Sequence, residues 1–173
     1  MPTTEVNHCK KTVYKVAYGA KPFKINATSK SKMTFTSSKS KIAAVDKNIG
    51  RVTIKNTGVA TITIKAGKVS KKVTIKVSPK KPSIKSVKTA KGKKLTVKWE
   101  KDKMALGYYV QLGTDKKFKK NVKSKSLSKT SYMFTKLKTG KRYYVRIRSY
   151  KKSGNETSYG AWSKAKVSGK IKK

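Results

Sequence analysis

The chain has 173 residues, with 47 Lys and Arg against 6 Asp and Glu, which gives a formal net charge of +41. A charge this large is typical of disordered chains, but 35% of the residues are hydrophobic, and their regular spacing predicts a folded protein. Lysine outnumbers arginine 43 to 4, which argues against a protein that reads DNA bases with the guanidinium fork of arginine.

Apolar and polar residues alternate with a period of two from about Val13 onward, which is typical of strands. The first half of the chain predicts strands at 12–18, 23–28, 32–38, 42–45, 51–54, 60–65 and 71–77. Turn signals that end at Gly50, Gly58 and Gly67 separate several of them. Short strands at this spacing predict a sandwich or barrel, and the lack of a sustained 3.6-residue period predicts almost no helix.

Pro79 and Pro82 interrupt this series, and proline in a sheet is confined to strand starts, edges and joints because it has no N–H to donate. A second series of strands is expected at 83–90, 94–100, 107–113, 131–137, 141–150 and 161–171. The chain is therefore predicted to be all-β, with two tandem β-sandwiches joined by a short Pro/Lys linker. The expected boundaries are a flexible segment at 1–11, a domain at 12–78, the linker at 79–82 and a second domain at 83–173.

The same alternation separates core positions from surface positions. Lysine takes most outward positions, as Lys72 and Lys76 do on either side of Thr74 in the strand at 71–77. The residues expected to be buried are Ile62, Ile64, Val73 and Ile75 in the first domain, and Trp99, Val110, Leu137, Tyr143, Val145 and Ile147 in the second.

The stretch FTSSKSKIAAVDKNIGRVTIKNTGVATITIKA, residues 35–66, resembles the bacterial immunoglobulin-like group 2 domain. The shared pattern is an aromatic residue, Thr-Ser-Ser, Val/Ile-Ala-x-Val, a glycine before a Val-Thr strand, and Gly-x-Ala-x-Ile. The positions that carry it are Phe35, Ser37, Ser38, Ile42, Ala43, Val45, Gly50, Val52, Gly58, Ala60 and Ile62. The resemblance covers roughly residues 12–78.

Residues 82–173 resemble a fibronectin type III domain. Trp99 in LTVKWE corresponds to the tryptophan of the second strand, and GYYVQL corresponds to the third strand. The segment LKTGKRYYVRIRSY is similar to the tyrosine corner of that family, through Leu137, Gly140 and Tyr143. Together the two resemblances imply tandem immunoglobulin-like sandwiches like those in the Lys-rich C-terminal regions of Gram-positive surface and secreted proteins. They also imply a protein that is not an enzyme, because both families serve display, spacing and adhesion.

The sequence predicts no catalytic residues, metal site or cofactor. His8 and Cys9 are the only His and the only Cys, and adjacent side chains on an extended chain point apart. Glu100 and Asp102 are too few to build an oxygen cage, and the lysines around them lower a carboxyl pKa rather than raise it. No apolar run approaches the about 20 residues of a membrane span, so we expect no membrane insertion. The segment 1–11 has no hydrophobic stretch of a signal peptide.

The densest basic run, residues 114–129, has two interpretations. As a functional feature it is a contact for polyanions. As a structural feature it is a solvated loop whose lysines protect a strand edge from unwanted pairing. The lysines assigned to polyanion binding are Lys116, Lys117, Lys119, Lys120, Lys123 and Lys125.

The outer face of the strand at 141–150 also has two interpretations. If its alternate residues point inward, Tyr144, Arg146, Arg148 and Tyr150 point outward, beside Tyr109 of the neighbouring strand. They then form either a platform for a sugar or anionic polymer, with both arginines in the polyanion site, or a stacking ladder with Trp162. We favour the ladder because the Trp-Ser pair in YGAWS resembles the start of the tryptophan-serine motif of cytokine-receptor fibronectin domains.

These features predict a non-enzymatic cell-surface or secreted module for adhesion and spacing. It is expected to bind polyanions electrostatically, such as cell-wall teichoic acid, acidic glycans and non-specific nucleic acid including extracellular DNA, and to be extracellular, secreted or cell-wall associated. Its other expected partners are further domains of a larger surface protein, or a virion. Two alternatives remain open, namely a pure spacer whose charge reflects its lineage, and a phage virion decoration protein.

Overall fold

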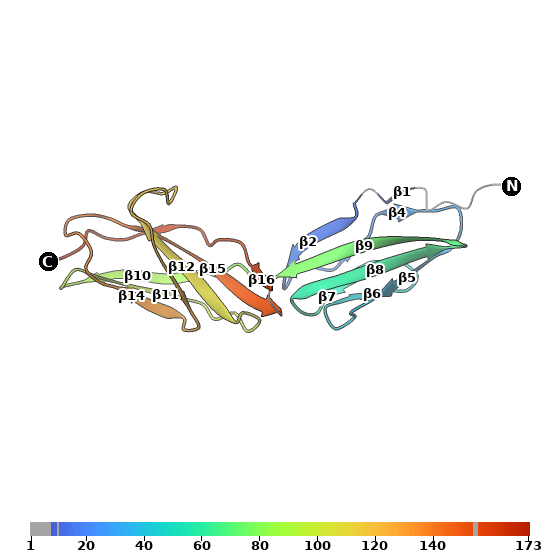
Figure 1. Cartoon of the computed structure of the whole chain (residues 1–173), viewed down its shortest axis with the longest axis horizontal. Helices are drawn as coiled ribbons and strands as arrows, with labels where there is room; N and C mark the ends of the chain where they lie inside the picture. Colours follow the sequence, from blue (N-terminus) through green and yellow to red (C-terminus); the bar gives the residue numbers. More distant parts are fainter. Residues whose placement is uncertain (1–7, 10, 154–155) are drawn as a thin grey trace. The chain divides into compact units, whose positions relative to one another are not determined.

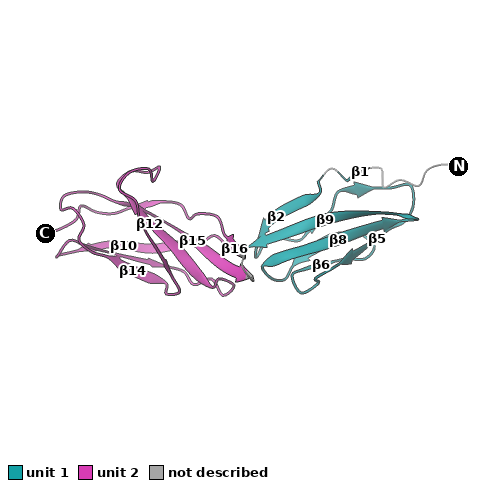
Figure 2. Cartoon of the chain, in the orientation of Figure 1, with its two compact units in different colours: residues 1–78 teal, residues 79–173 magenta. Residues whose placement is uncertain are grey.

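The computed structural model describes residues 8–9, 11–153 and 156–173. These residues form strands and turns without a helix, so the predicted all-β class is confirmed (Figure 1). None of them lies in a helix that is long and apolar enough to cross a membrane. The chain divides into two compact units, Met1–Ser78 and Pro79–Lys173, which Figure 2 shows in different colours.

Unit 1 is a sandwich of a four-stranded and a three-stranded sheet. The larger sheet has the order β2-β9-β8-β5, formed by β2 (Val13–Ala17), β9 (Val69–Ser78), β8 (Gly58–Ala66) and β5 (Met33–Ser37). The smaller sheet has the order β3-β7-β6, formed by β3 (Phe23–Lys24), β7 (Arg51–Ile54) and β6 (Ala43–Val45). A further pair joins β1 (His8–Cys9) to β4 (Ala27–Thr28), so two residues of the segment expected to be flexible form a strand.

Unit 2 is a sandwich of a three-stranded and a five-stranded sheet. The smaller has the order β10-β11-β14, formed by β10 (Ile84–Ala90), β11 (Lys94–Trp99) and β14 (Ser131–Phe134). The larger has the order β13-β12-β15-β16, formed by β13 (Lys123–Leu127), β12 (Gly107–Gly113), β15 (Tyr144–Ser153) and β16 (Glu156–Tyr159). In addition, β17 (Lys166–Val167) pairs with β15.

Each unit has its own hydrophobic core, and the alternation of the sequence explains which residues enter it. Apolar residues at every second position of a strand reach the same face, so β9 buries Val73, Ile75 and Val77 and exposes Lys72 and Lys76. All the residues predicted to be buried have a relative exposure of 5% or less; they are Ile62, Ile64, Val73, Ile75, Trp99, Val110, Leu137, Tyr143, Val145 and Ile147.

The turn before β7 shows how a local signal supports the core of unit 1. The carboxylate of Asp46 accepts the backbone N–H groups of Asn48 and Ile49 at 2.9 and 3.0 Å. Gly50 follows with a φ of +66°, and a Cβ on this residue would lie 2.7 Å from the ring of Phe35. Glycine is therefore required at this position for two reasons, the left-handed backbone and the close approach of a buried ring.

The first residues of the predicted linker pack on unit 2. The backbone N–H of Lys80 donates to the carboxylate of Asp102 at 3.1 Å, and the hydroxyl of Ser149 donates to the carbonyl of Lys80. A Cβ on Gly160 would lie 2.7 Å from the carbonyl oxygen of Pro79. Pro79 and Lys80 therefore belong structurally to the start of the second sandwich.

The residues of the predicted tyrosine corner are also brought together. Tyr143 is buried, and its hydroxyl accepts the backbone N–H of Lys138 at 3.2 Å. This hydrogen bond ties the turn that contains Gly140 to the start of β15.

Candidate polyanion-binding surface

The outer face of β15 carries two arginines that stack on one tryptophan. The guanidinium carbons of Arg146 and Arg148 lie 4.2 and 4.6 Å from the ring centroid of Trp162. Both distances are within the about 6 Å range of a cation–π interaction. The contact between Trp162 and these arginines that the sequence predicts is therefore present.

Backbone docking of Ser163 explains why Trp162 reaches this position. The backbone N–H of Ser163 donates to the carbonyl of Ile147 at 2.7 Å, and the N–H of Ile147 donates to the hydroxyl of Ser163 at 3.0 Å. Arg146 and Arg148 flank Ile147 and point to the opposite face of the sheet. The serine of the Trp-Ser pair thus fixes the chain, and the indole next to it covers both guanidinium groups.

The stack is longer than the sequence predicted. Arg146 also lies 4.3 Å from the ring centroid of Phe118, and Arg148 lies 3.8 Å from that of Tyr159. We call these five side chains the ladder, in the order Phe118, Arg146, Trp162, Arg148 and Tyr159. Neither end was assigned from the sequence, because Phe118 lies in a lysine run and Tyr159 precedes the recognised Trp-Ser pair.

The ladder engages its guanidinium groups within the fold. Arg146 has an aromatic ring on each side, and its Nε donates to the Oε1 of Gln111 at 2.8 Å. Burial, and then the nearby positive charge of Arg148, lowers the pKa of Arg146. Both arginines thus have a structural role, and their assignment as polyanion contacts stays a prediction.

The predicted aromatic set is only partly gathered at the ladder. Tyr109 lies 5.9 Å from Trp162 between ring centroids, and its ring is 5.3 Å from the guanidinium of Arg148. Tyr150 lies 6.0 Å from Tyr159, at one end of the group. Tyr144 lies at the start of β15, where its backbone pairs with Gly113 of β12 and Val167 of β17.

The loop between β12 and β13, residues 114–122, is called here the basic loop. The carboxylate of Asp115 accepts the backbone N–H groups of Lys117, Lys119 and Lys120 at 2.9, 3.0 and 2.7 Å. These hydrogen bonds, that of Lys120 first, lower the pKa of the Asp115 carboxyl. Phe118 has a φ of +56° and is only 9% exposed, because its ring packs on Arg146.

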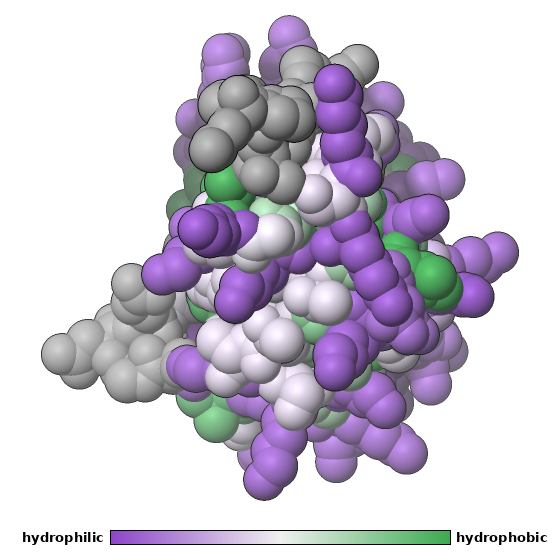
Figure 3. Space-filling view, turned by 90° about the vertical axis from the view of Figure 1, so that its right-hand side faces the viewer, coloured by the Kyte–Doolittle hydropathy of each residue, from purple (hydrophilic) through white to green (hydrophobic). Residues whose placement is uncertain are grey.

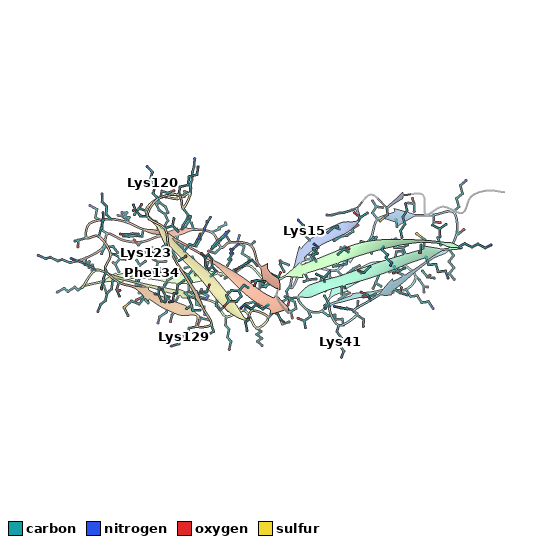
Figure 4. The ribbon with its side chains drawn as sticks, in the orientation of Figure 1. Lys15, Lys41, Lys120, Lys123, Lys129 and Phe134 are labelled. Atoms are coloured by element: carbon teal, nitrogen blue, oxygen red, sulfur yellow. The ribbon has the colours of Figure 1, made fainter. Side chains whose placement is uncertain are left out.

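The fold directs the lysines of the basic loop into solvent. Lys116, Lys117, Lys119 and Lys120 are all exposed, while Phe118 in their midst is buried. Figure 4 shows Lys120 on the part of the loop that projects from the sheet. Four exposed lysines therefore flank one buried anchor in the sequence.

Lys123 and Lys125 are separate from this group. They pair with Leu112 and Val110, which are buried, so the two lysines lie on the core side of β13 at the edge of the sheet. The ladder lies on the opposite face, where Gln111 and Tyr109 point. Both side chains are nevertheless exposed, because β13 is an edge strand, where inward-pointing charges are a common protection. The structure therefore separates Lys123 and Lys125 from the four lysines of the basic loop.

The acids of the described residues leave much of this positive charge unopposed. Asp46 and Asp115 accept backbone N–H groups of their own turns, and Asp102 accepts those of Lys80 and Met104. Lysine meanwhile occupies exposed positions of both units, and the face in Figure 3 is largely hydrophilic, with isolated hydrophobic spots. Within the described part of the chain, no three His, Cys, Asp or Glu side chains come together in a group that could hold a metal ion.

Comparison with protein families identifies the two units. Residues 79–166, just over half of the chain, match the fibronectin type III domain. The chain belongs to the fibronectin type III family. Residues 22–68 match the immunoglobulin-like domain of intimin. The predicted order, a bacterial immunoglobulin-like domain followed by a fibronectin type III domain, is confirmed.

Solved structures with similar folds are distant in sequence. The chicken CNTN1 FN1–FN3 domains share 16% identity over 83% of this chain, with a TM-score of 0.46, and this chain spans 57% of their length. The FN5 domain of Drosophila Lar shares 16% identity over 55% of this chain and 98% of its own, with a TM-score of 0.44. The sixth fibronectin type III domain of human fibronectin type III domain containing protein 3 shares 16% identity over 54% of this chain and 84% of its own, with a TM-score of 0.41. No curated protein matches the chain.

The two families set the class of the protein. Fibronectin type III and bacterial immunoglobulin-like domains are typically non-catalytic, and their combination indicates a surface or adhesion module. The intimin-like domain indicates an extracellular or surface protein. Neither family specifies a ligand, because function lies in sites carried by a fold and not in the fold itself.

Proposed function

We propose that this chain is an adhesion and spacer module that binds polyanionic polymers through its lysine surface. The observation that supports this most is the large excess of lysines over acids. Of these acids, Asp46 and Asp115 accept backbone N–H groups of their own turns, and Asp102 accepts that of Lys80, so these three carboxylates also hold the backbone in place. Six acids cannot balance 47 Lys and Arg, so a net charge of +41 remains after every acid is counted.

Lysine suits contact with irregular polymers. Its ammonium is a hydrated point charge on a flexible stem, whereas arginine offers a planar fork that matches one geometry. Of the four arginines, Arg146 and Arg148 are engaged in the ladder. We therefore expect teichoic acid, acidic glycans and extracellular DNA to bind with similar affinity, at the cell wall or in secreted material.

Retention on three immobilised polymers tests the proposal. The full chain is applied to heparin, teichoic acid and mixed-sequence DNA across a series of salt concentrations. Binding to all three should weaken together, because each neutralised phosphate releases a counterion with a slope near 0.9 for duplex DNA. A strong preference for one polymer that persists at about 1 M salt, where the Debye length is about 3 Å, would contradict the proposal and indicate a shaped site.

Weak binding to every polymer has a different meaning. If the chain is retained by none of the three at physiological ionic strength, its lysines serve solubility rather than adhesion. The pure spacer, or the decoration protein of a phage virion, then becomes the better interpretation.

A further inference from the structure

We infer that the basic loop is the primary contact for polyanions, and that within this broad binding the loop contributes most to a flexible phosphodiester chain without bases or sugar rings. This inference rests on the proposed function, because it names the loop and the ligand class of that binding. It goes further by assigning the affinity to one preformed segment rather than to the whole charged surface.

Two independent anchors fix the basic loop. The carboxylate of Asp115 gathers three backbone N–H groups, with Lys117 on Oδ1 and Lys119 and Lys120 on Oδ2. Phe118 docks on the sheet through the guanidinium of Arg146, at 4.3 Å. A loop that is ordered before binding loses less conformational entropy when the ligand arrives. Its lysines should therefore contribute more binding free energy than lysines on less ordered segments.

The anchors also concentrate positive charge. Lys116, Lys117, Lys119 and Lys120 are exposed within five consecutive residues. The one acid beside them, Asp115, keeps its single negative charge while both carboxylate oxygens accept N–H groups of the same loop, so four positive charges and one negative charge give residues 115–120 a net charge of +3. A polymer with closely spaced phosphates can therefore meet several ammonium groups at once, and lysine binds phosphate as a point charge.

The aromatic residues of this region favour a ligand that offers charge alone. Proteins that bind single-stranded nucleic acid stack bases on free aromatic faces, at about 1–3 kcal/mol per base. Here Phe118 is buried, and Trp162 lies against the guanidinium groups of Arg146 and Arg148. Tyr159 is 43% exposed, but it lies at the Arg148 end of the ladder and not in the basic loop. The one aromatic residue of the loop itself thus gives a base or a sugar ring little to stack on, whereas a chain of phosphodiesters joined by short flexible units needs no such surface.

The variant Asp115→Asn distinguishes a preformed loop from attraction by net charge alone, because the two predict opposite changes in the affinity for the polymer. The change adds one positive unit, so an affinity set by net charge alone should rise. Whichever way the new amide turns, its NH2 group faces at least one backbone N–H that Asp115 now accepts. We expect the loop to loosen and the affinity for polyglycerol phosphate to fall about three- to tenfold at physiological ionic strength.

Asp46→Asn is the matched control. It adds the same charge at another capped turn, and Oδ1 of Asp46 accepts both N–H groups, so an asparagine oxygen preserves them. This variant should bind polyglycerol phosphate as tightly as the unchanged chain, or more tightly. If Asp115→Asn also binds as tightly or more tightly while melting normally, the preformed loop is refuted.

A pair of fourfold variants locates the contact. In the loop variant, Lys116, Lys117, Lys119 and Lys120 become Gln; in the control, Lys85, Lys88, Lys94 and Lys98 of β10 and β11, also exposed, become Gln. Both lose four charges. The loop variant should bind polyglycerol phosphate about tenfold or more weakly. Its slope of log affinity against log salt concentration should be shallower by about 3, because each contact with a flexible strand contributes about 0.7. The control should lose clearly less affinity, because its lysines are spread along two strands and are not clustered within five consecutive residues.

The outcomes distinguish a failure of the loop inference from a failure of the proposed function. Equal losses in both fourfold variants would refute the loop and leave the proposed function intact, whereas no binding by the unchanged chain would refute the proposed function itself. Heparin and single-stranded DNA serve as comparison ligands in the same titrations. A larger loss on either of them than on polyglycerol phosphate would overturn the assigned ligand class.

Discussion

Replacing Trp162 with leucine and Arg148 with methionine, singly and together, measures what the ladder contributes to unit 2. Leucine and methionine keep apolar volume and remove the aromatic face and the guanidinium. The contact under test has a distance of 4.6 Å from guanidinium carbon to ring centroid. For a partly buried pair, a cation–π interaction contributes about 1 kcal/mol, within a range of about 0.5–2 kcal/mol.

The single variants alone do not isolate this energy. Trp162→Leu also removes the contacts with Arg146 and Tyr109, so its loss should be about 1–3 kcal/mol. Arg148→Met removes contacts with three rings, but it also removes a buried Nε that has no hydrogen-bond partner among the described residues. An unsatisfied buried donor costs about 1–3 kcal/mol, which offsets the lost stacking, so the double-mutant cycle is needed.

Urea unfolding followed by tryptophan fluorescence reports on unit 2 alone. The chain has two tryptophans, Trp99 and Trp162, and both lie in this unit. Trp99 is 2% exposed and remains as the reporter in every variant. With unchanged m-values, the cycle should give a coupling of about 1 kcal/mol. A coupling below about 0.3 kcal/mol, the usual scatter of additive sites, would refute the ladder as a stabilising unit.

Three further predictions concern the scaffold. Tyr143→Phe removes the acceptor of the tyrosine-corner hydrogen bond, and the same urea titration should show a loss of about 1 kcal/mol. Gly50→Ala places a Cβ 2.7 Å from the ring of Phe35 at a φ of +66°. It should destabilise unit 1 by about 2–4 kcal/mol in calorimetry, from backbone strain and displacement of a core ring. Backbone N–H groups lower the pKa of Asp46 and Asp115. Their stabilising contribution is therefore present above the ordinary carboxyl pKa and is lost as pH falls through the folded-state value. Melting temperatures of the double Asp→Asn variant should depend less on pH in this acidic range, and an unchanged pH profile would contradict the assignment.

The core and the ladder's centre could be predicted because both follow strand periodicity. Val145 and Ile147 face inward, and this alone places Arg146 and Arg148 on the outer face of β15. The Trp-Ser resemblance then supplied Trp162. Period-two alternation is a local property, so it can be recognised in the sequence before any pairing of strands is known.

The rest of the site depends on tertiary contacts and strand register, which the alternation of the sequence does not predict. Phe118 adopts a left-handed backbone within a lysine run, and only the docked loop shows that its ring reaches Arg146. Lys123 and Lys125 were grouped with the loop because they follow it in sequence. Their face is set by the register of β13 on β12, and a shift of one residue would reverse it.

The salt dependence of binding to polyglycerol phosphate tests the central claim most directly. The full chain is titrated with this polymer at several salt concentrations, and the logarithm of the affinity is plotted against the logarithm of the salt concentration. The proposed charge-driven contact predicts a straight line that falls by about 0.7 per contacted phosphate, and therefore by several units for a loop with four exposed lysines. A slope near zero with measurable binding would show that the lysine surface does not hold the polymer by charge, and would contradict the account.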